Sequence, residues 1–320
     1  MNVKLFEEYY EKIRKNCARI IVGKDECIRN IVIAYLAGGH VLLEDVPGTG
    51  KTMLFRAFSR SVGGSYKRIQ FTPDIMPSDL TGIHFYNNKS GEFEFRPGPL
   101  FAQMVLADEI NRATPRTQSS LLEAMSEGQI TVDGNTFFIE RPFMVMATQN
   151  PLESGGTFPL PEAQKDRFMM KLSLGYMQRE EELLVLARED TIDLLAQISQ
   201  VVTKEETLEL QKLYPDIEVS EPVKGYLMDI IESTRTDRRI LQGASTRAAL
   251  SLYKAAQLSA ALYGRSYVIP EDVRDLAVCI MEHRLSYYGI IRGSEGADIC
   301  REIVDSIPVP TEMISFKGER

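Results

Sequence analysis

The glycine-rich segment 44–52, with the sequence EDVPGTGKT, lies between an apolar run at 40–44 and a stretch of helical periodicity at 51–62. A strand that turns through glycines into a helix lets backbone N–H groups surround phosphate oxygens at the positive end of the helix dipole. Lys51 would then reach the β- and γ-phosphates of a nucleotide, and the Thr52 hydroxyl would bind Mg²⁺. The segment therefore predicts a P-loop in an α/β fold.

One position departs from the usual pattern G-x-x-x-x-G-K-[ST], because Asp45 stands where the first glycine is expected. A chance Gly-Lys-Thr is the alternative interpretation, but the flanking strand and helix favour a P-loop. Asp45 also lies at the strand end, where glycine is least needed for close approach to phosphate. The residues expected to hold the nucleotide here are Val46, Pro47, Gly48, Thr49, Gly50, Lys51, Thr52 and Met53.

Polar residues follow two further apolar runs. The run 104–107 ends in Asp108 and Glu109, and the run 142–148 leads to Asn150. In a parallel sheet the carboxyl ends of the strands meet at one edge, so these residues would arrive beside the P-loop. We expect Asp108 to hold Mg²⁺ and Glu109 to be the general base that polarises the attacking water. Asn150 would bind that water or the γ-phosphate, unless it only forms a turn before Pro151.

Two arginines are candidates for phosphate contacts from outside the P-loop. Arg167 precedes the run 168–174, and it could stabilise the transferred phosphoryl group of a neighbouring subunit. Arg247 begins a helix after Gly243-Ala244-Ser245-Thr246, and it could couple the nucleotide state to the angle between two domains. The alternatives are a surface salt bridge for Arg167 and a solvent-exposed helix start for Arg247.

The order of apolar runs predicts a parallel sheet followed by a helical bundle. Strand-like runs at 67–71, 103–107, 142–148 and 168–174 alternate with helices at 51–62 and 116–127. Two hairpins, around turns at 87–91 and 133–135, interrupt this alternation. Leu5, Tyr9, Ile13 and Cys17 recur at four-residue spacing, which predicts an N-terminal helix. After residue 175 only helices are expected, with a linker near 190–203, which divides the chain into 1–190 and 204–320.

Composition excludes several other classes of protein. The 320 residues carry 37 Lys and Arg against 45 Asp and Glu, a formal charge of −8, and 44% are hydrophobic. Such a chain is too hydrophobic to be disordered, and it has no apolar run long enough to cross a membrane. Its acidic balance argues against a protein built mainly to coat nucleic acid and leaves room for local basic patches. Acidic residues near the N-terminus oppose a secretory signal, so we expect a cytoplasmic protein. The four cysteines and three histidines are scattered, which predicts reduced, packed thiols rather than disulfides or zinc ligands.

Taken together, these residues resemble the MoxR family of AAA+ ATPases. The order is Walker A (45–52), Walker B (Asp108, Glu109), sensor 1 (Asn150), arginine finger (Arg167) and sensor 2 (Arg247). The stretch 106–134 carries the most specific likeness, and 70–74, 77–82, 96–99 and 160–164 also fit the family. The segment 21–23 resembles the one that contacts adenine, which adds Val22 and Gly23 to the expected nucleotide contacts, although Lys24 replaces the usual Gln.

The resemblance implies more than the residues themselves indicate. It implies an α/β core with strand order 5-1-4-3-2, an insert in helix 2, a hairpin before sensor 1, and a small all-α lid. It also implies homo-oligomeric rings, usually hexamers, with ATP and Mg²⁺ between subunits. Such proteins are thought to be chaperone-like remodelers of protein partners, often partners with a von Willebrand factor A domain. The two hairpins would then face the ring pore or the client.

Three other functions are weighed against this one. A nucleic-acid motor or loader on the same scaffold is opposed by the acidic composition and by the lack of a recognisable DNA-binding module. A GTPase or small-molecule kinase is opposed by the missing Asn-Lys-x-Asp, since Gly91 follows Asn88-Lys89-Ser90. A nucleotide-binding scaffold without activity is opposed by competent residues at every catalytic position.

Overall fold

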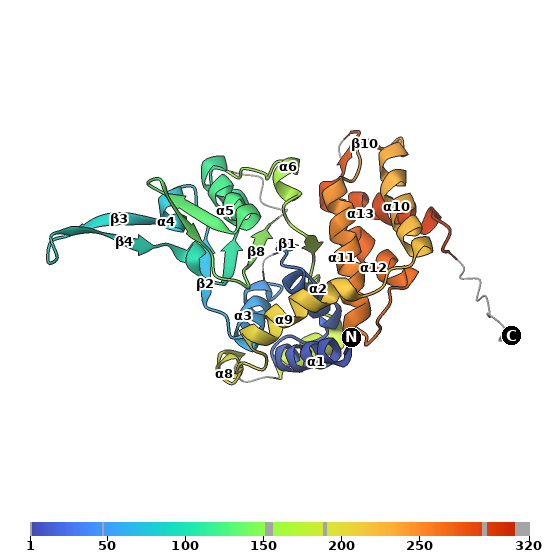
Figure 1. The fold of residues 1–320 in the computed structure, drawn as a ribbon, viewed down its shortest axis with the longest axis horizontal. Coiled ribbons are helices and arrows are strands. Elements are labelled where there is room, and N and C mark those ends of the chain that lie inside the picture. Colours follow the sequence, from blue (N-terminus) through green and yellow to red (C-terminus); the bar gives the residue numbers. More distant parts are fainter. Residues whose placement is uncertain (1, 47, 151–155, 188–190, 290–292, 311–320) are drawn as a thin grey trace.

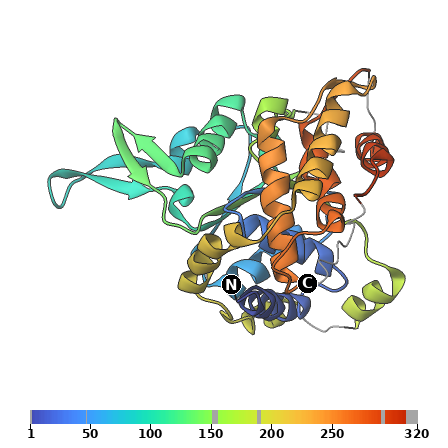
Figure 2. The same ribbon diagram turned by 45° about the vertical axis from the view of Figure 1, so that its right-hand side comes forward.

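The computed structural model describes residues 2–46, 48–150, 156–187, 191–289 and 293–310. An α/β part holds the sheet, and a group of helices from the C-terminal third packs beside it (Figure 1). Two hairpins extend from the α/β part on the side away from those helices (Figure 2). Among the described residues, no helix has the length and apolar character needed to cross a membrane.

The sheet has five parallel strands in the order β2 (Tyr66–Gln70), β5 (Met104–Asp108), β8 (Met144–Gln149), β1 (Val41–Glu44) and β9 (Met170–Leu172). Numbered by their order in the chain as core strands, this is the expected 5-1-4-3-2 arrangement, which is confirmed. The register pairs Ala107 with Ala147, and Leu42 with Ala147, so that β1, β5 and β8 end together. The residues that follow these three strands therefore meet at one edge.

Both faces of the sheet are buried, because successive side chains of a strand point to opposite sides. In β5, Leu106 packs with one hydrophobic cluster, and Val105 and Ala107 pack with another. Four helices supply much of the cover: α1 (Lys4–Ala18), α2 (Asp25–Leu36), α3 (Lys51–Val62) and α5 (Pro115–Glu127).

The predicted N-terminal helix is present as α1. Its buried face holds Phe6, Tyr9, Ile13 and Cys17, whereas Leu5 is 38% exposed. Spacings of three and four residues both keep side chains on one helix face, so Phe6 joins Tyr9 equally well. All four cysteines are free thiols, as expected, and burial raises the pKa of Cys17, Cys27 and Cys300 to about 12.

The two predicted hairpins are present. β3 (Gly82–Asn87) pairs with β4 (Glu92–Pro97), and β6 (Gln129–Val132) pairs with β7 (Asn135–Phe138). The longer β3–β4 hairpin projects well beyond the body of the molecule (Figure 1). Phe95 of β4 stacks on Phe137 of β7 with ring centroids 4.7 Å apart, so the two hairpins support each other near their bases.

The part of the chain after residue 175, called the helical part below, consists mainly of helices. They are α7 (Arg179–Leu186), α8 (Thr191–Ala196), α9 (Lys204–Leu213), α10 (Glu221–Thr236), α11 (Thr246–Leu262), α12 (Pro270–Met281) and α13 (Glu295–Ser306). The expectation of helices alone was wrong, because β10 (Ile240–Gln242) pairs with β11 (Ser286–Tyr287). The predicted linker 190–203 also contains α8, and Val202 within it is buried beside α3, whose Ser61 carbonyl accepts a hydrogen bond from the Val201 amide. The division into 1–190 and 204–320 remains a prediction.

Candidate nucleotide site

The loop between β1 and α3 has the conformation that its glycines allow. Gly48 and Gly50 have φ angles of 88° and 89°, in the left-handed region that favours glycine. α3 begins at Lys51, and the Lys51 ammonium donates hydrogen bonds to the carbonyl oxygens of Asp45 (2.7 Å) and Val46 (3.1 Å). Partial burial lowers the pKa of Lys51. Pro47, which the sequence also assigns to the site, lies outside the described residues.

Asp45 has a role that the sequence did not indicate. Its side chain is buried, and its Oδ2 accepts hydrogen bonds from the backbone amides of Leu174 and Gly175, the latter at 3.2 Å. Those amides belong to the chain as it leaves β9, the strand next to β1. The carboxylate thus joins the start of the phosphate loop to the end of the neighbouring strand, which accounts for an aspartate at this position.

The two acidic residues at the end of β5 are held by a shared hydroxyl. Thr148 Oγ1, on β8, donates to Asp108 Oδ1 (2.6 Å) and accepts from the Glu109 amide (2.9 Å). Asp108 Oδ2 also accepts two hydrogen bonds from the Arg68 guanidinium, at 2.7 and 3.1 Å. Glu109 has φ 58° and ψ 49°, a conformation that costs a residue with a Cβ atom roughly 1–2 kcal/mol.

The Glu109 carboxylate is itself engaged on one oxygen. Glu109 Oε2 accepts a hydrogen bond from Gln70 Nε2 (2.8 Å) and forms an ion pair with Arg112 Nε (3.2 Å). Gln70 and Arg68 lie two residues apart on β2, so they share one face of that strand. Sequence reasoning missed Arg68, Gln70 and Thr148, because only the pairing of β2, β5 and β8 brings them to the acids.

A cavity of about 340 Å³ unites most of the predicted residues. Backbone amides of a helix start, an ammonium group, a hydroxyl and two carboxylates meet there. This donor set suits a triphosphate with Mg²⁺, since amides and Lys51 can bind anionic oxygens, and Thr52 and Asp108 offer the oxygens that Mg²⁺ prefers. The lining residues are Gly48, Thr49, Gly50, Lys51, Thr52, Met53, Asp108, Glu109, Thr148, Gln149 and Asn150.

The segment expected to contact adenine lies next to this cavity rather than in its wall. A Cβ atom on Gly50 would be 3.7 Å from Ile21 Cδ1, which places the segment 21–23 against the P-loop. The Glu181 carboxylate of α7 lies over Gly23, and Lys24 Nζ donates to the Tyr176 carbonyl oxygen at 3.0 Å. Val22 is half-buried and Gly23 is exposed in this loop between α1 and α2.

The two predicted arginines lie elsewhere. Arg167 is exposed, and its Nη1 donates to the Leu122 carbonyl oxygen (2.7 Å) and to Ser126 Oγ (2.9 Å) at the end of α5. Arg247 Nη1 forms an ion pair with Asp166 at 3.1 Å. Neither is among the described residues that line the cavity.

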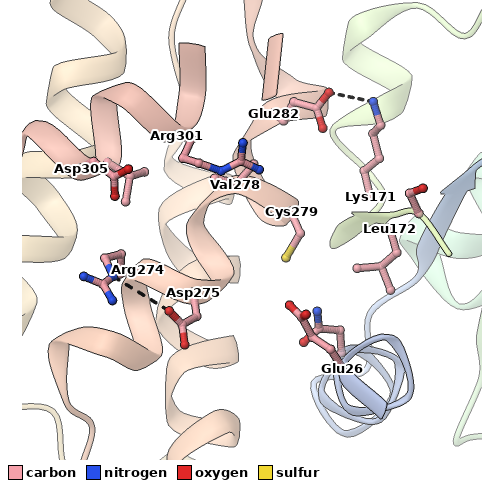
Figure 3. A pocket seen from close by; sticks show the side chains of 13 residues that line it. Glu26, Lys171, Leu172, Arg274, Asp275, Val278, Cys279, Glu282, Arg301 and Asp305 are labelled. Atoms are coloured by element: carbon pink, nitrogen blue, oxygen red, sulfur yellow. Dashed lines mark hydrogen bonds and ion pairs between the residues drawn. The ribbon is translucent and has the colours of Figure 1, made fainter. Parts of the chain in front are cut away.

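A second cavity, of about 420 Å³, separates α2 and β9 from α12 and α13 (Figure 3). At its edge Lys171 of β9 forms ion pairs with Glu44, the last residue of β1, and with Glu282 (2.8 Å), which follows α12. Burial disfavours the charged lysine, but the carboxylates of Glu282 and Glu44 outweigh that effect and raise the pKa of Lys171. The strand that leads into the P-loop is therefore connected to the helical part through one side chain.

Comparisons with known proteins agree with this geometry. Residues 40–170 match the family described as the ATPase family associated with various cellular activities (AAA), and residues 232–303 match the AAA lid domain. The chain is 47% identical to the uncharacterised protein YeaC of Bacillus subtilis over 93% of this chain and 94% of that protein. It is 41% identical to Chaperone MoxR1 of Mycobacterium tuberculosis over 83% of this chain and 73% of that protein. A crystal structure of a proposed ATPase from Cytophaga hutchinsonii, 36% identical, superposes with a TM-score of 0.88 over 97% of both chains.

Proposed function

Because this chain belongs to the MoxR family of AAA+ ATPases, we propose that it binds ATP with Mg²⁺ at the P-loop and hydrolyses it to ADP and phosphate. The observation that carries the proposal is the 340 Å³ cavity, which brings Lys51, Thr52, Asp108, Glu109 and Asn150 together. The loop amides and Lys51 would bind the phosphates, with Val46, Pro47 and Met53 beside them, and Val22 and Gly23 would contact the adenine. Thr52 and Asp108 would hold Mg²⁺, which neutralises charge on the phosphates.

Glu109 is the residue proposed to accept the proton of the attacking water, and Asn150 the residue proposed to orient that water. The Glu109 carboxylate now faces Gln70 and Arg112. Those contacts engage Oε2, and Glu109 already lines the cavity in which the water would be held. Its strained backbone, whose amide donates to Thr148 Oγ1, keeps the carboxylate at the cavity.

Three variants test the assignment. Lys51→Ala is expected to abolish ATP binding, since the ammonium group would contact the phosphates. Glu109→Gln is expected to bind ATP normally and to lose turnover by about 10²–10⁴-fold, the usual contribution of a general base. Glu123→Gln, at an exposed position on α5, is the matched control and should retain both. Titration calorimetry and a phosphate-release assay give the two readouts; unaltered turnover of Glu109→Gln would contradict the role of Glu109.

We further propose that the active form is a homo-oligomeric ring, with six subunits as the expected number, in which Arg167 completes the site of a neighbouring subunit. Support comes from the position of Arg167, which is exposed and bound to α5 rather than to the cavity of its own chain. Arg247 is proposed to reach the γ-phosphate of its own subunit when the helical part closes.

The proposed work of this ATPase is chaperone-like remodelling of a protein partner, which we expect to carry a von Willebrand factor A domain. A relative named as a chaperone supports the first part of this proposal. Exposed aromatic side chains on the hairpins, Phe93 (74% exposed) and Phe138 (81%), offer a surface for such a partner. The Glu109→Gln variant, loaded with ATP, should co-purify with the partner. Stimulation of turnover by DNA at physiological salt would instead favour a nucleic-acid motor.

A further inference from the structure

The segment that carries Arg167 is held by the helical part of the same chain. This segment, residues 162–172, comprises α6 (Glu162–Lys165), the turn with Arg167, and β9. Ser286 donates a hydrogen bond to Glu162, His283 Nε2 lies 3.0 Å from the Phe168 carbonyl oxygen, and Lys171 pairs with Glu282. The last of these contacts is visible in Figure 3.

Asp166, the residue before Arg167, forms two ion pairs with the helical part. Its Oδ1 accepts from Ser245 Oγ (3.3 Å) and faces Arg284 Nε (3.1 Å), and its Oδ2 faces Arg247 Nη1 (3.1 Å). Arg284 also donates to the carbonyl oxygen of Phe168 at 2.8 Å. The Asp166 carboxylate therefore contacts three side chains of the helical part, and one of them, Arg284, also binds the residue after Arg167.

The two ion pairs of Asp166 differ in strength. The Arg284 side chain is 2% exposed, and burial lowers the pKa of its guanidinium to about 10, so Asp166 is needed to compensate a buried charge. The Arg247 side chain is 58% exposed, and a pair of that kind is worth less than about 1 kcal/mol. Asp166 is thus the counter-charge of a buried guanidinium in its pair with Arg284, whereas the exposed Arg247 can exchange partners at little cost.

The Arg167 side chain extends away from the helical part, on the side opposite to Asp166. Its guanidinium is bonded to the end of α5, at Leu122 and Ser126, while Asp166 faces the helical part. Neighbouring residues that bind opposite sides fix the backbone between them. The position of the Arg167 side chain then depends on where the helical part stands relative to α5.

We propose that Asp166 is a positioning residue. Through it, the helical part of each subunit determines the position of Arg167, the side chain that the subunit presents to the nucleotide of its neighbour. This inference rests on the proposed function, because it needs Arg167 to act on a neighbouring subunit. It adds that Asp166 acts in the subunit that donates the arginine rather than in the subunit that hydrolyses ATP.

Mixed rings separate these two locations. A chain with Arg167→Ala keeps its nucleotide site and lacks the arginine, and a chain with Lys51→Ala keeps the arginine and lacks the site. Each alone should be inactive, and their mixture should hydrolyse ATP where the two kinds of subunit meet. Asp166→Asn is then added either to the arginine donor or to the hydrolysing chain.

In the donor, Asp166→Asn should lower the maximal rate of the mixture by about tenfold, with the Michaelis constant for ATP unchanged, because a misplaced catalytic group reduces rate rather than binding. In the hydrolysing chain it should change the rate by less than about twofold, because that chain no longer carries Arg167. Asp237→Asn is the matched control, since it breaks an ion pair with Arg239 inside the helical part and should have no effect in either chain.

Arg247→Gln in the donor is a milder second variant, for use if Asp166→Asn lowers the unfolding temperature. The donor binds no nucleotide, so the change there acts through the ion pair of Arg247 with Asp166, and a rate decrease of about two- to threefold is expected from the weaker pair.

The outcomes are distinct. An inactive mixture without any change at Asp166 would overturn the shared site, and the inference with it. An active mixture that is insensitive to both donor variants, or one in which Asp166→Asn acts only in the hydrolysing chain, would overturn the inference and leave the proposed function standing.

Discussion

At the scale of single residues, Asp45 is the most informative departure from a familiar motif. Its carboxylate binds the amides of Leu174 and Gly175 beyond the neighbouring strand, so its side chain is directed away from the phosphate position. A residue that looks like a defect in the nucleotide site is therefore part of the scaffold that holds the loop in place.

We therefore predict that Asp45→Gly, which restores the usual motif, destabilises the protein. Removing the carboxylate leaves a buried amide without its partner, which costs about 1–3 kcal/mol. Urea unfolding measures the change, and Asp74→Gly, at an exposed position, is the control. A variant with Asp45→Gly that is as stable as the parent and binds ATP more tightly would show that the aspartate is tolerated rather than required.

Most of the residues that line the cavity could be predicted from the sequence, because each follows a recognisable strand or lies in the glycine-rich loop. Lys51, Asp108 and Asn150 meet since parallel strands end at one edge. Arg68, Gln70 and Asp166 could not be predicted, because their partners lie 39 to 118 positions away and depend on strand order and on the packing of the helical part. The helix α8 was also missed, since a six-residue helix has too few turns to show a periodicity.

At the scale of elements, His40 connects the start of β1 to β8 and to α5 through hydrogen bonds. Its Nδ1 accepts a hydrogen bond from the Val145 amide at 3.0 Å, and its Nε2 faces the Met125 carbonyl oxygen at 3.0 Å. This pattern fits a neutral ring, and burial lowers the pKa of His40 to about 4. Burial also lowers the pKa of His283, which lies between the sheet and the helical part.

The stability of the fold should consequently depend on pH in the acidic range. Between about pH 6.5 and 4 the unfolded chain binds a proton at His40 that the folded chain does not bind, so the free energy of unfolding falls as the pH falls. The full contribution, up to about 3 kcal/mol, is present above pH 6.5.

Urea unfolding at several pH values measures this slope. His40→Gln is expected to flatten it, because that variant has no imidazole to titrate at this position. A slope that is identical in the parent and in His40→Gln would exclude His40 as its source.

At the scale of the whole molecule, the α/β part and the helical part are joined by charges that flank the nucleotide site. Lys171 links the helical part to the strand before the P-loop, and Asp166 links it to the turn that carries Arg167. A rotation of the helical part would thus displace residues at two places. One is the strand before the P-loop of the same chain, and the other is Arg167, which is presented to another chain.

Arg167→Ala is expected to fold and to bind ATP like the parent and yet to lose turnover by about 10³–10⁵-fold, the range measured for arginines of this kind.

Turnover per chain of the parent protein should also rise with protein concentration, because a site shared between chains forms only on association. Sedimentation and phosphate release over the same concentrations test both statements. Full activity in pure Arg167→Ala protein would reject the assignment.

The base of the β3–β4 hairpin has a mechanical consequence. At Gly82 a Cβ atom would lie 2.4 Å from the Arg96 carbonyl oxygen, and at Gly98 one would lie 2.2 Å from that of Leu80, so backbone meets backbone there without intervening side chains. Such a root is stiff. A six-residue strand is about 20 Å long, so a tilt of roughly ten degrees at the root would sweep the tip through about 3–4 Å. A small rotation of the α/β part would therefore produce a larger displacement at the tip of the hairpin than at its base.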